Sequence, residues 1–482
     1  TRPQQLPAPF EQVPRRRRVA GNGIVDEGSH HHAAAADLPG IPVQGDPALP
    51  FLLAARLVTC TPESRPVFAE GLASSYEAFL DTRRKREAGN DVVDEEETLP
   101  DMAACDDAGR WYLERIDEMV GRGPDGGHAP AHPKLDATVE RAIDLWTRGE
   151  KVLIFIHYIA TGRALREALS ARIRSEIEQR AAERLGLRTG QAFEQLMRLA
   201  ERLDEGEPAA RACRRKVDDL LAGFSDLSDE TERIHRVVLR FLRRPSFIVR
   251  YFDLRSGTIG AADVDRAFDA SDASGLPLRK VVENFLYCLE HQCSGADREA
   301  YLDAVESIQT GATYGGEAVE DEDEGGRRKF VGNVRLINGA TAHETRQRLM
   351  LAFNTPFFPE IMVTSSVMSE GVDLHLNCRH IIHHDLAWNP SNLEQRTGRV
   401  DRIGAKAEHA GQPIHVYMPY VAETQDEKMY RVVMDRERWF NVVMGGRIVT
   451  DARSAEEIAN RIPLPESAKD ALMLDLSVRS TE

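Results

Sequence analysis

Residues 361–404 decide the fold of this chain: IMVTSSVMSEGVDLHLNCRHIIHHDLAWNPSNLEQRTGRVDRIG. The stretch begins with four apolar or β-branched residues, Ile361–Thr364, followed by small and polar residues. A second short apolar run contains Ile381 and Ile382, and a helical pattern starts near Ser391. Short continuous apolar runs are typical of strands buried on both faces. The stretch therefore predicts two strands of a parallel sheet followed by a helix.

The same alternation extends outward on both sides. Residues 151–158 read KVLIFIHY, whose β-branched centre predicts a strand, and a helix precedes it from near Lys134. A further strand is expected at Val334–Ile337, a helix at His343–Phe353 and a last strand at 415–418. Strands that alternate with helices form parallel sheets with covered faces. The predicted fold class is α/β, with a central parallel sheet covered by helices.

Composition shifts divide the rest of the chain. Residues 1–50 mix Pro, Gly, the run of four arginines Arg15–Arg18 and three histidines, which predicts a loosely ordered lead-in. Residues 51–130 form a helical segment and linker, and the α/β lobe takes 131–160 and 330–445. Between these two parts, 161–329 shows helical periodicity and ends in an acidic, glycine-rich loop. We interpret 161–329 as a helical insertion and 446–482 as a helical tail.

Length and charge exclude several classes of protein. With 482 residues and 42% apolar side chains, the chain can bury more than one core. It contains 62 basic and 78 acidic side chains, which argues against nucleic-acid binding through bulk charge. Six scattered cysteines and the lack of a long apolar segment predict a cytoplasmic protein without membrane contact. Because the first residue is Thr rather than Met, we expect a fragment of a longer protein.

Two segments of the opening stretch carry chemistry. Residues 365–374, SSVMSEGVDL, place hydroxyls, a carboxylate and a glycine in one turn, which suits close approach to a phosphate. Arg396, Arg399 and Arg402 are three residues apart, which predicts that they line one helix face. Three such arginines repel one another unless nearby anions neutralise their charge. Glu394 and Asp401 can neutralise part of this positive charge, and a bound triphosphate could neutralise the rest.

These residues resemble motifs V and VI of superfamily-two helicases and translocases, and most of all their SWI/SNF-like bacterial branch. The family pattern is roughly SEG-x-N-L-Q, then D-L-P-W-N-P, then E-Q-R-x-G-R-x-D-R-x-G-Q. This chain matches most of these positions over about forty residues. It departs from them at Asp373, His375, Ala387 and Ala405. Residues 151–158 resemble motif IV, 336–353 resemble the following motif, and 424–427 resemble the T-x-D-E segment after motif VI.

The resemblance implies a second RecA-like helicase lobe that faces a nucleotide held by a first lobe. It also implies that the helical segment and linker at 51–130 come from that first lobe. It implies that Arg399 and Arg402 are arginine fingers that stabilise charge developing on the γ-phosphate. Arg396 is either a nucleotide contact or a structural residue. The other implied nucleotide contacts are Gln395, Glu370, Gly371 and Asp373. The implied contacts to a nucleic-acid backbone, with DNA favoured over RNA and no sequence specificity, are Ser365, Ser366, Arg346, His157 and Tyr158.

The phosphate-holding half of such an enzyme is absent from the sequence. No Gly-Lys dipeptide occurs anywhere, so there is no P-loop, and the acidic run at 94–96 follows only two apolar residues. We therefore expect ATP and Mg²⁺ to be held by a P-loop lobe, either upstream in cis or in trans. The chain alone is expected to be inactive.

Other interpretations remain open. The chain could be a non-catalytic module, derived from a helicase lobe, that binds nucleic acid or a partner protein. Half of a two-lobed sugar-nucleotide transferase is a third idea, which the arginine string disfavours. His30–His32, the group Cys288, His291 and Cys293, and the group His380, His383 and His384 each suggest a metal site, but their spacing favours structural roles. For 424–427 we favour capping of the next helix.

Overall fold

The structure, a computed structural model, describes residues 16–20, 23–26, 40–60, 65–87, 111–112, 114–116, 118–119, 132–273, 275–307, 332–365, 373–387 and 389–443. Its centre is a sheet of strand order β2-β1-β7-β6-β3-β5-β4. The strands are β1 (Arg16–Ala20), β2 (Gly23–Asp26), β3 (Lys151–Phe155), β4 (Val334–Ile337), β5 (Ile361–Thr364), β6 (Cys378–His383) and β7 (Ile414–Met418). All neighbouring strands from β1 to β4 pair in parallel, and β2 is antiparallel to β1. The predicted α/β class with a central parallel sheet is confirmed.

Burial explains why these short runs become strands. Every residue of β3 and β5 is buried, as expected for strands covered on both faces. Alternate residues contribute to different cores: Val152 and Ile154 belong to one, whereas Leu153 and Phe155 belong to the other. A slip of one residue would exchange the two faces, so the two cores together fix the register.

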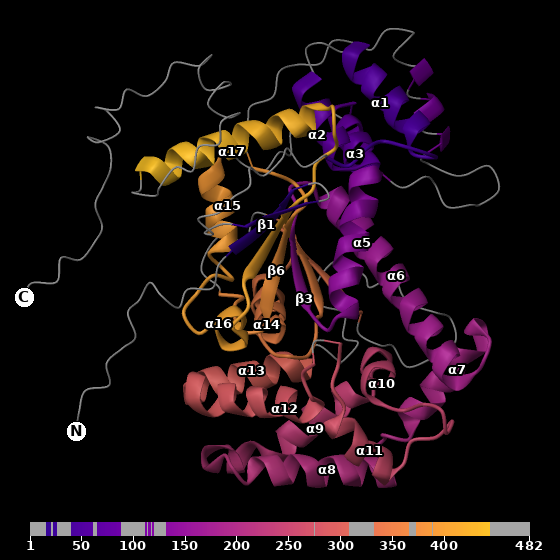
Figure 1. The fold of residues 1–482 in the computed structure, drawn as a ribbon, viewed down its shortest axis with the longest axis vertical. Helices are drawn as coiled ribbons and strands as arrows, with labels where there is room; N and C mark the ends of the chain where they lie inside the picture. Colours follow the sequence, from indigo (N-terminus) through magenta and orange to yellow (C-terminus); the bar gives the residue numbers. More distant parts are fainter. Residues whose placement is uncertain are drawn as a thin grey trace, which may run out of the picture.

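Helices cover both faces of the sheet (Figure 1). On one face, α5 (Pro133–Thr147) and α6 (Ile159–Leu185) share a core with β3 and β5. On the other, the covering helices are α14 (His343–Phe353), α15 (Pro390–Thr397), α16 (Lys406–Ala410) and α17 (Gln425–Val443). The predicted capping of the last helix is confirmed, because the hydroxyl of Thr424 accepts a hydrogen bond from the Asp426 N–H at 3.2 Å.

Three N-terminal helices lie at the end of the lobe where the strands finish (Figure 1). They are α1 (Ala48–Cys60), α2 (Arg65–Ser74) and α3 (Tyr76–Glu87). Phe51, Tyr76 and Phe79 form their small core, which also includes Val421. Ser74 and Ser75 bond the buried hydroxyl of Thr161 at 2.6 and 2.9 Å, which fixes α2 and α3 to the start of α6.

The helices between β3 and β4 gather at the opposite end of the sheet, where the strands begin (Figure 1). Phe241 stacks on Phe357, with ring centroids 4.1 Å apart, in the loop that leads into β5. The region therefore shares one hydrophobic core with the sheet. After α6 its elements are α7 (Thr189–Glu201), α8 (Pro208–Leu221), η2 (Ser225–Glu230), α9 (Thr231–Leu242), α10 (Pro245–Tyr251), α11 (Ala261–Asp269), α12 (Leu278–Tyr287), η3 (Cys288–Gln292) and α13 (Gly295–Ser307).

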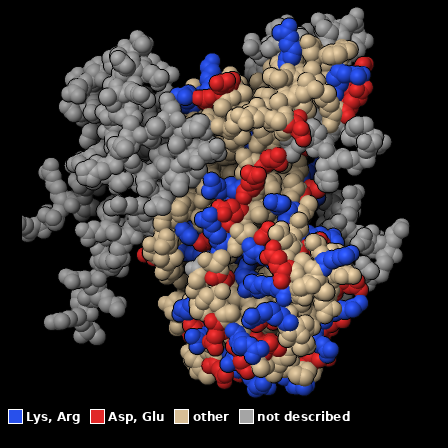
Figure 2. All heavy atoms as spheres, turned by 45° about the vertical axis from the view of Figure 1, so that its right-hand side comes forward, with Lys and Arg blue, Asp and Glu red and all other residues tan. Residues whose placement is uncertain are grey.

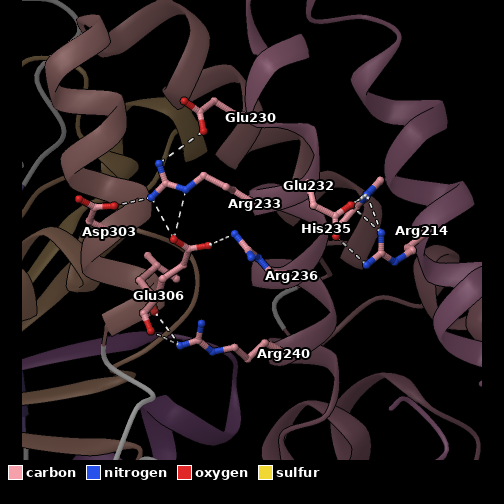
Figure 3. Close-up of polar contacts among 10 residues, drawn as sticks. Arg214, Glu230, Glu232, Arg233, His235, Arg236, Arg240, Asp303 and Glu306 are labelled. Carbon is pink, nitrogen blue, oxygen red and sulfur yellow. Dashed lines mark hydrogen bonds and ion pairs between the residues drawn. The ribbon is translucent and has the colours of Figure 1, made fainter. Parts of the chain in front are cut away.

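Ion pairs fix α9 to α13 within this helical region. Arg233 lies between Asp303 and Glu306, at 2.5 and 3.0 Å, and Arg236 bonds the other oxygen of Glu306 at 3.1 Å (Figure 3). Arg240 donates to the Glu306 backbone carbonyl at 2.5 Å. The surface in Figure 2 accordingly mixes both signs of charge over this region, so its arginines do not form a basic face on the side shown.

Strands occupy residues 16–20 and 23–26, inside the stretch for which a loosely ordered lead-in was expected. There β1 extends the sheet by pairing with β7, from Arg16↔Ile414 to Ala20↔Met418. A basic run carries no apolar periodicity, so side-chain patterning could not indicate this strand. The strand forms because it provides hydrogen-bond partners for the main-chain N–H and C=O groups at the edge of β7.

Several expectations fall on residues that the structure does not describe. They are the histidines at 30–32, the acidic runs at 94–97 and 320–324, and the tail at 446–482. The described helices include none with the combination of length and apolar character that crossing a bilayer requires.

A buried ion pair joins α5 to α17. Lys134 Nζ lies 3.0 Å from Asp426 Oδ1, with 1% and 3% of the two side chains exposed. Asp426 Oδ2 also accepts the Val421 N–H at 2.8 Å. The two partners are 292 positions apart in the chain, so the pair ties the first helix of the lobe to its last.

Replacing Lys134 with Met should leave the Asp426 carboxylate buried without its cation. We expect a loss of about 3–5 kcal/mol in the free energy of unfolding, measured by urea denaturation. Asp144→Asn, at the half-exposed partner of Arg148, is the control and should change stability by less than about 1 kcal/mol. Equal effects of the two variants would contradict this account.

Candidate functional site

The parallel sheet brings four chain segments to its carboxyl edge. His157 and Tyr158 follow β3, Asn338 follows β4, Ser365 follows β5, and Asp385 lies just beyond β6. Since β6, β3, β5 and β4 are neighbours in that order, these segments lie side by side. Ligands of open parallel sheets bind outside this edge.

Asp385 organises the edge from within. Its side chain is 6% exposed, and Oδ2 accepts the His157 N–H at 2.7 Å. Burial raises the pKa of Asp385, but His384, Lys134 and the His157 N–H outweigh burial, so the pKa lies below its usual range. The ionised carboxylate thereby fixes the turn that carries His157 and Tyr158. Their rings meet edge to face at 4.8 Å, with His157 exposed.

Ser365 and Arg346, which were also predicted to contact nucleic acid, lie at or near this edge. Ser365 is 1% exposed, and its Oγ has no hydrogen-bond partner among the described residues. Arg346, in the first turns of α14, donates to the Thr341 carbonyl at 3.2 Å. Ser366, Glu370 and Gly371 lie outside the described residues, as does Trp388.

The three arginines do not share one helix face, which corrects that expectation. Asn389 caps α15 by accepting the Ser391 N–H at 3.0 Å, and the helix ends at Thr397 with Gly398 as its C-cap. Glycine has a low helix propensity, and a turn follows it. Arg396 is therefore the only one of the three arginines on the helix, whereas Arg399 and Arg402 lie on the turn.

Arg396 has a structural environment. It is 4% exposed, donates to the Asp385 carbonyl at 3.2 Å and lies 5.4 Å from the centre of the Phe155 ring. Burial lowers its pKa to about 10, opposed by Asp385. Of the two roles expected for Arg396, the geometry favours the structural one. Gln395, its neighbour, is exposed.

Arg402 lies at the opposite, amino edge of the sheet. Its Nη2 is 3.0 Å from Asp373 Oδ1, its Nε donates to the Gly398 carbonyl at 2.9 Å, and 47% of the side chain is exposed. Arg399 is half-buried, and its Nε has no partner within the described residues. The predicted site residues thus form two groups, one at each edge, with α15 running between them.

The turn that carries Arg402 is fixed at both ends. The Leu374 N–H donates to the Arg399 carbonyl at 2.8 Å, and the Lys406 N–H donates to the His375 carbonyl at 2.9 Å. Lys406 Nζ then bonds the buried carboxylate of Glu150 at 2.8 Å. Although burial raises the pKa of Glu150, Lys406, His380 and Arg379 hold it well below its usual range.

Asn354, at the end of α14, was not predicted from the sequence. Its Nδ2 donates to the Asp373 carbonyl at 2.5 Å, its Oδ1 accepts the Leu376 N–H at 3.4 Å, and its own carbonyl accepts from Asn377 at 2.5 Å. One buried side chain therefore holds the segment opposite Arg402. An asparagine after a helix carries no sequence signal for such distant partners.

The histidines of β6 and the following residue are engaged by protein groups. His384 Nε2 donates to the Ser74 carbonyl at 3.0 Å, and its Nδ1 accepts from the Thr138 hydroxyl at 2.8 Å. His380 lies 3.2 Å from the Tyr417 hydroxyl, and His383 lies 3.3 Å from the Thr397 hydroxyl. Across the described ranges, no group of three or more His, Cys, Asp or Glu residues is arranged to hold a metal ion.

Comparison with known proteins shows which family this part of the chain is similar to. Residues 322–404 match the family described as helicase conserved C-terminal domain. The chain carries a helicase C-terminal lobe. The lobe is similar over 86 residues, at 30% identity, to the uncharacterized ATP-dependent helicase YqhH of Bacillus subtilis, covering 18% of this chain and 14% of the relative.

Two further relatives of the helicase lobe place it in the SWI/SNF-like branch of superfamily two. The DNA repair and recombination protein RAD54B of Gallus gallus is 28% identical over 25% of this chain and 12% of its own length. The RNA polymerase-associated protein RapA of Vibrio cholerae is 35% identical over 19% of this chain and 9% of its own length. The chain thus spans less than a fifth of each relative.

Among solved structures, the C-terminal part of the Fun30 ATPase domain is similar at 17% identity and a TM-score of 0.19. The similarity covers 29% of this chain and 37% of that one.

Asn354→Ala should loosen the turn that carries Arg402. The Asp373 carbonyl and the Leu376 N–H would lose their partner, which costs about 1–3 kcal/mol for buried groups. We expect faster hydrogen exchange at the Leu374 and Leu376 amides, measured by mass spectrometry. Asn392→Ala, at an exposed position of α15, is the matched control. Unchanged exchange in the Asn354 variant would remove this residue from the site.

His384 should make stability depend on pH. Burial lowers its pKa to about 4 from the ordinary 6.5, helped by Lys134 and opposed by Asp385. As the pH falls, the unfolded chain protonates this histidine at a higher pH than the folded chain does. The contribution of His384 to the free energy of unfolding is therefore complete above about pH 6.5 and is lost as the pH falls toward 4, by at most about 3 kcal/mol.

Urea unfolding of His384→Gln should give a shallower loss of stability between pH 6.5 and 4.5 than the parent protein. His409→Gln, at an exposed position, is the control and should keep the parent slope. Parallel curves for all three proteins would rule out His384 as a source of the pH dependence.

Proposed function

We propose that this lobe is half of an ATP-dependent nucleic-acid helicase or translocase, in which Arg402 and Arg399 reach a nucleotide held by a P-loop lobe. The observation that carries the proposal is the difference between the arginines. Arg396 is buried and paired, whereas Arg402 is charged, half-exposed and presented by a turn fixed on both sides. A preorganised cation of this kind stabilises charge that develops on a phosphoryl group.

Asp373 supports this proposal. Its ion pair with Arg402 is about half-exposed on both sides, and exposed pairs contribute about 0–1 kcal/mol. A triphosphate can therefore replace the carboxylate at little cost. In the absence of nucleotide, the pair keeps the guanidinium near the place where it would act. Asp373 thus serves Arg402 rather than the nucleotide directly.

The nucleotide and its metal would belong mainly to the other lobe. Mg²⁺ would be bound there with the β- and γ-phosphates and would neutralise their charge. In this chain, Gln395 is the exposed residue of α15 expected to help position the nucleotide. Glu370 and Gly371 keep their proposed roles as nucleotide contacts.

The carboxyl edge is the proposed nucleic-acid face. An exposed His157, the adjacent Tyr158 and the guanidinium of Arg346 provide donors for backbone phosphates, with Ser365 at the neighbouring strand end. Ser366, which follows Ser365 in the sequence, keeps its proposed role as a backbone contact. Such contacts hold a strand without reading bases. We propose DNA as the polymer, since one relative is named as a DNA repair and recombination protein. We further propose that the protein works in the cytoplasm.

A non-catalytic module is the second candidate, favoured by the absence of a Gly-Lys dipeptide from the whole sequence. ATP hydrolysis distinguishes the two. The chain alone should show no DNA-stimulated hydrolysis, whereas addition of a P-loop lobe should produce it if the chain is an enzyme half. Continued absence of hydrolysis in the combined system would favour the module, and turnover by the chain alone would contradict both.

Arg402→Ala, in the protein that includes the P-loop lobe, should lower kcat for ATP hydrolysis by roughly 10³–10⁵-fold, because the developing charge loses its finger. Nucleotide affinity should change little. Arg148→Ala, at the 62% exposed arginine that follows α5 as its C-cap, is the matched control. Unchanged turnover in the Arg402 variant would refute the finger assignment.

A further inference from the structure

The helical region contains a π-helical turn, η3 (Cys288–Gln292), directly after α12. In an α-helix, residues five apart point about 140° away from each other. A π turn closes i→i+5 hydrogen bonds, which brings such residues onto one side of the chain. Cys288 and Cys293 are five apart: Cys288 is the first residue of this turn, and Cys293 directly follows it. Single π turns inserted into helices are frequent at functional sites.

The two thiols are accessible and interact. Both side chains are half-buried and unoxidised, whereas Cys213 and Cys378 are buried. The contact with Cys288, ahead of the opposing effect of burial, lowers the pKa of Cys293, and the same contact raises that of Cys288. Because the thiolate is the nucleophilic form of cysteine, Cys293 is the more reactive of the two.

Arg298 adds a fixed positive charge beside Cys293. Its Nε donates to the Leu289 carbonyl at 3.0 Å and its Nη1 to the Asp226 carbonyl at 2.6 Å, so the guanidinium is held in place. The contact with Cys288 is the main cause of the low pKa of Cys293, whereas Asp297 raises this pKa and Arg298 lowers it by a smaller amount. A cation next to a low-pKa thiol is typical of a reactive cysteine.

His291 does not convert this pair into a metal site. Its Nε2 lies 3.2 Å from Glu290, and its ring contacts Tyr287 at 4.6 Å and Phe224 at 6.4 Å. No third ligand joins the two thiols within the described residues. The pair is therefore left with thiol chemistry.

We propose that Cys288 and Cys293 form a redox-modification site, oxidised to an internal disulfide by a small-molecule disulfide such as glutathione disulfide. The Cys293 thiolate attacks one sulfur of the oxidant, breaks its S–S bond and releases one glutathione, which takes up the proton from Cys293. Cys288 then attacks the Cys293 sulfur of the mixed disulfide, and its proton goes to the second glutathione. The protein loses two electrons and two protons, and the oxidant becomes two thiols.

This site lies next to the residue that holds the Arg402 turn. Tyr301 of α13 is close to both thiols and to the Asn354 amide, all of which act on its pKa. Asn354 in turn bonds the Asp373 carbonyl. Tyr301 is therefore influenced both by the thiol pair and by Asn354, the residue that holds the segment carrying Asp373.

Tryptic mass mapping tests the proposal, because residues 281–298 form one peptide that holds both cysteines and no other. After incubation with glutathione disulfide and alkylation, this peptide should lose two hydrogen atoms and take no alkyl group, and dithiothreitol should reverse both changes. Cys288→Ser should accumulate glutathione on Cys293. Cys293→Ser should react roughly tenfold more slowly than Cys288→Ser.

Buried Cys213 and Cys378 serve as internal controls, and their peptides should stay reduced. Circular dichroism of both variants should match the parent protein. A parent peptide that takes two alkyl groups, or one that carries glutathione without closing the internal bond, would overturn the proposal. Equal glutathione uptake by the two serine variants would overturn the assignment of Cys293 as the attacking thiol.

Discussion

Parallel main-chain pairing of β3 with β5 and β6 is the constraint on which the rest of this lobe depends. Parallel strands need crossovers, so every strand of the parallel part of the sheet ends at the same edge, and the helices that return across the sheet end at the other. His157, Ser365 and Asp385 meet at the first edge for this reason. Asn354 and Arg402 meet at the second because α14 and α15 run back across the sheet.

Charge is handled differently at the two edges. At the carboxyl edge, a buried ionised Asp385 is surrounded by a neutral histidine and main-chain donors. At the amino edge, Glu150 collects Lys406 and Arg379, at 2.8 and 2.5 Å. In the helical region, Arg233 and Arg236 are neutralised by nearby carboxylates (Figure 3). Within an acidic chain, cationic function is therefore concentrated at individual positions such as Arg402.

Local patterning was enough to predict the strands. The runs at Ile361–Thr364 and Val334–Ile337 are apolar throughout or nearly so, and both are strands as expected. Side-chain patterning failed where main-chain hydrogen bonding or a single residue determines the secondary structure. A basic run became β1 because the edge of β7 needed a partner, and Gly398 ended α15 before Arg399. A spacing of three residues did not reveal that end.

The residue types of the candidate site were predictable from the sequence, but the separation of these residues into one group at each edge of the sheet was not. The sequence indicates arginines and a phosphate-binding turn, yet only the fold shows that Arg396 is internal. Asn354 and the Lys134–Asp426 pair depend on contacts between distant segments, which no local pattern records. The π turn at Cys288 likewise has no sequence signature, and the five-residue spacing of the two cysteines does not indicate a contact within a regular helix.

The pairing of β1 with β7 has a consequence for how the lobe is made. Residues 16–20 join residues 414–418, and Ile41 bonds Tyr420 and Ala422. On the ribosome, the first strand must wait until nearly the whole lobe has emerged before its neighbour exists. Such non-local closure is slow and leaves a strand edge open to wrong partners meanwhile. The nascent chain therefore depends on its central strands and helical region to remain folded until the two ends meet.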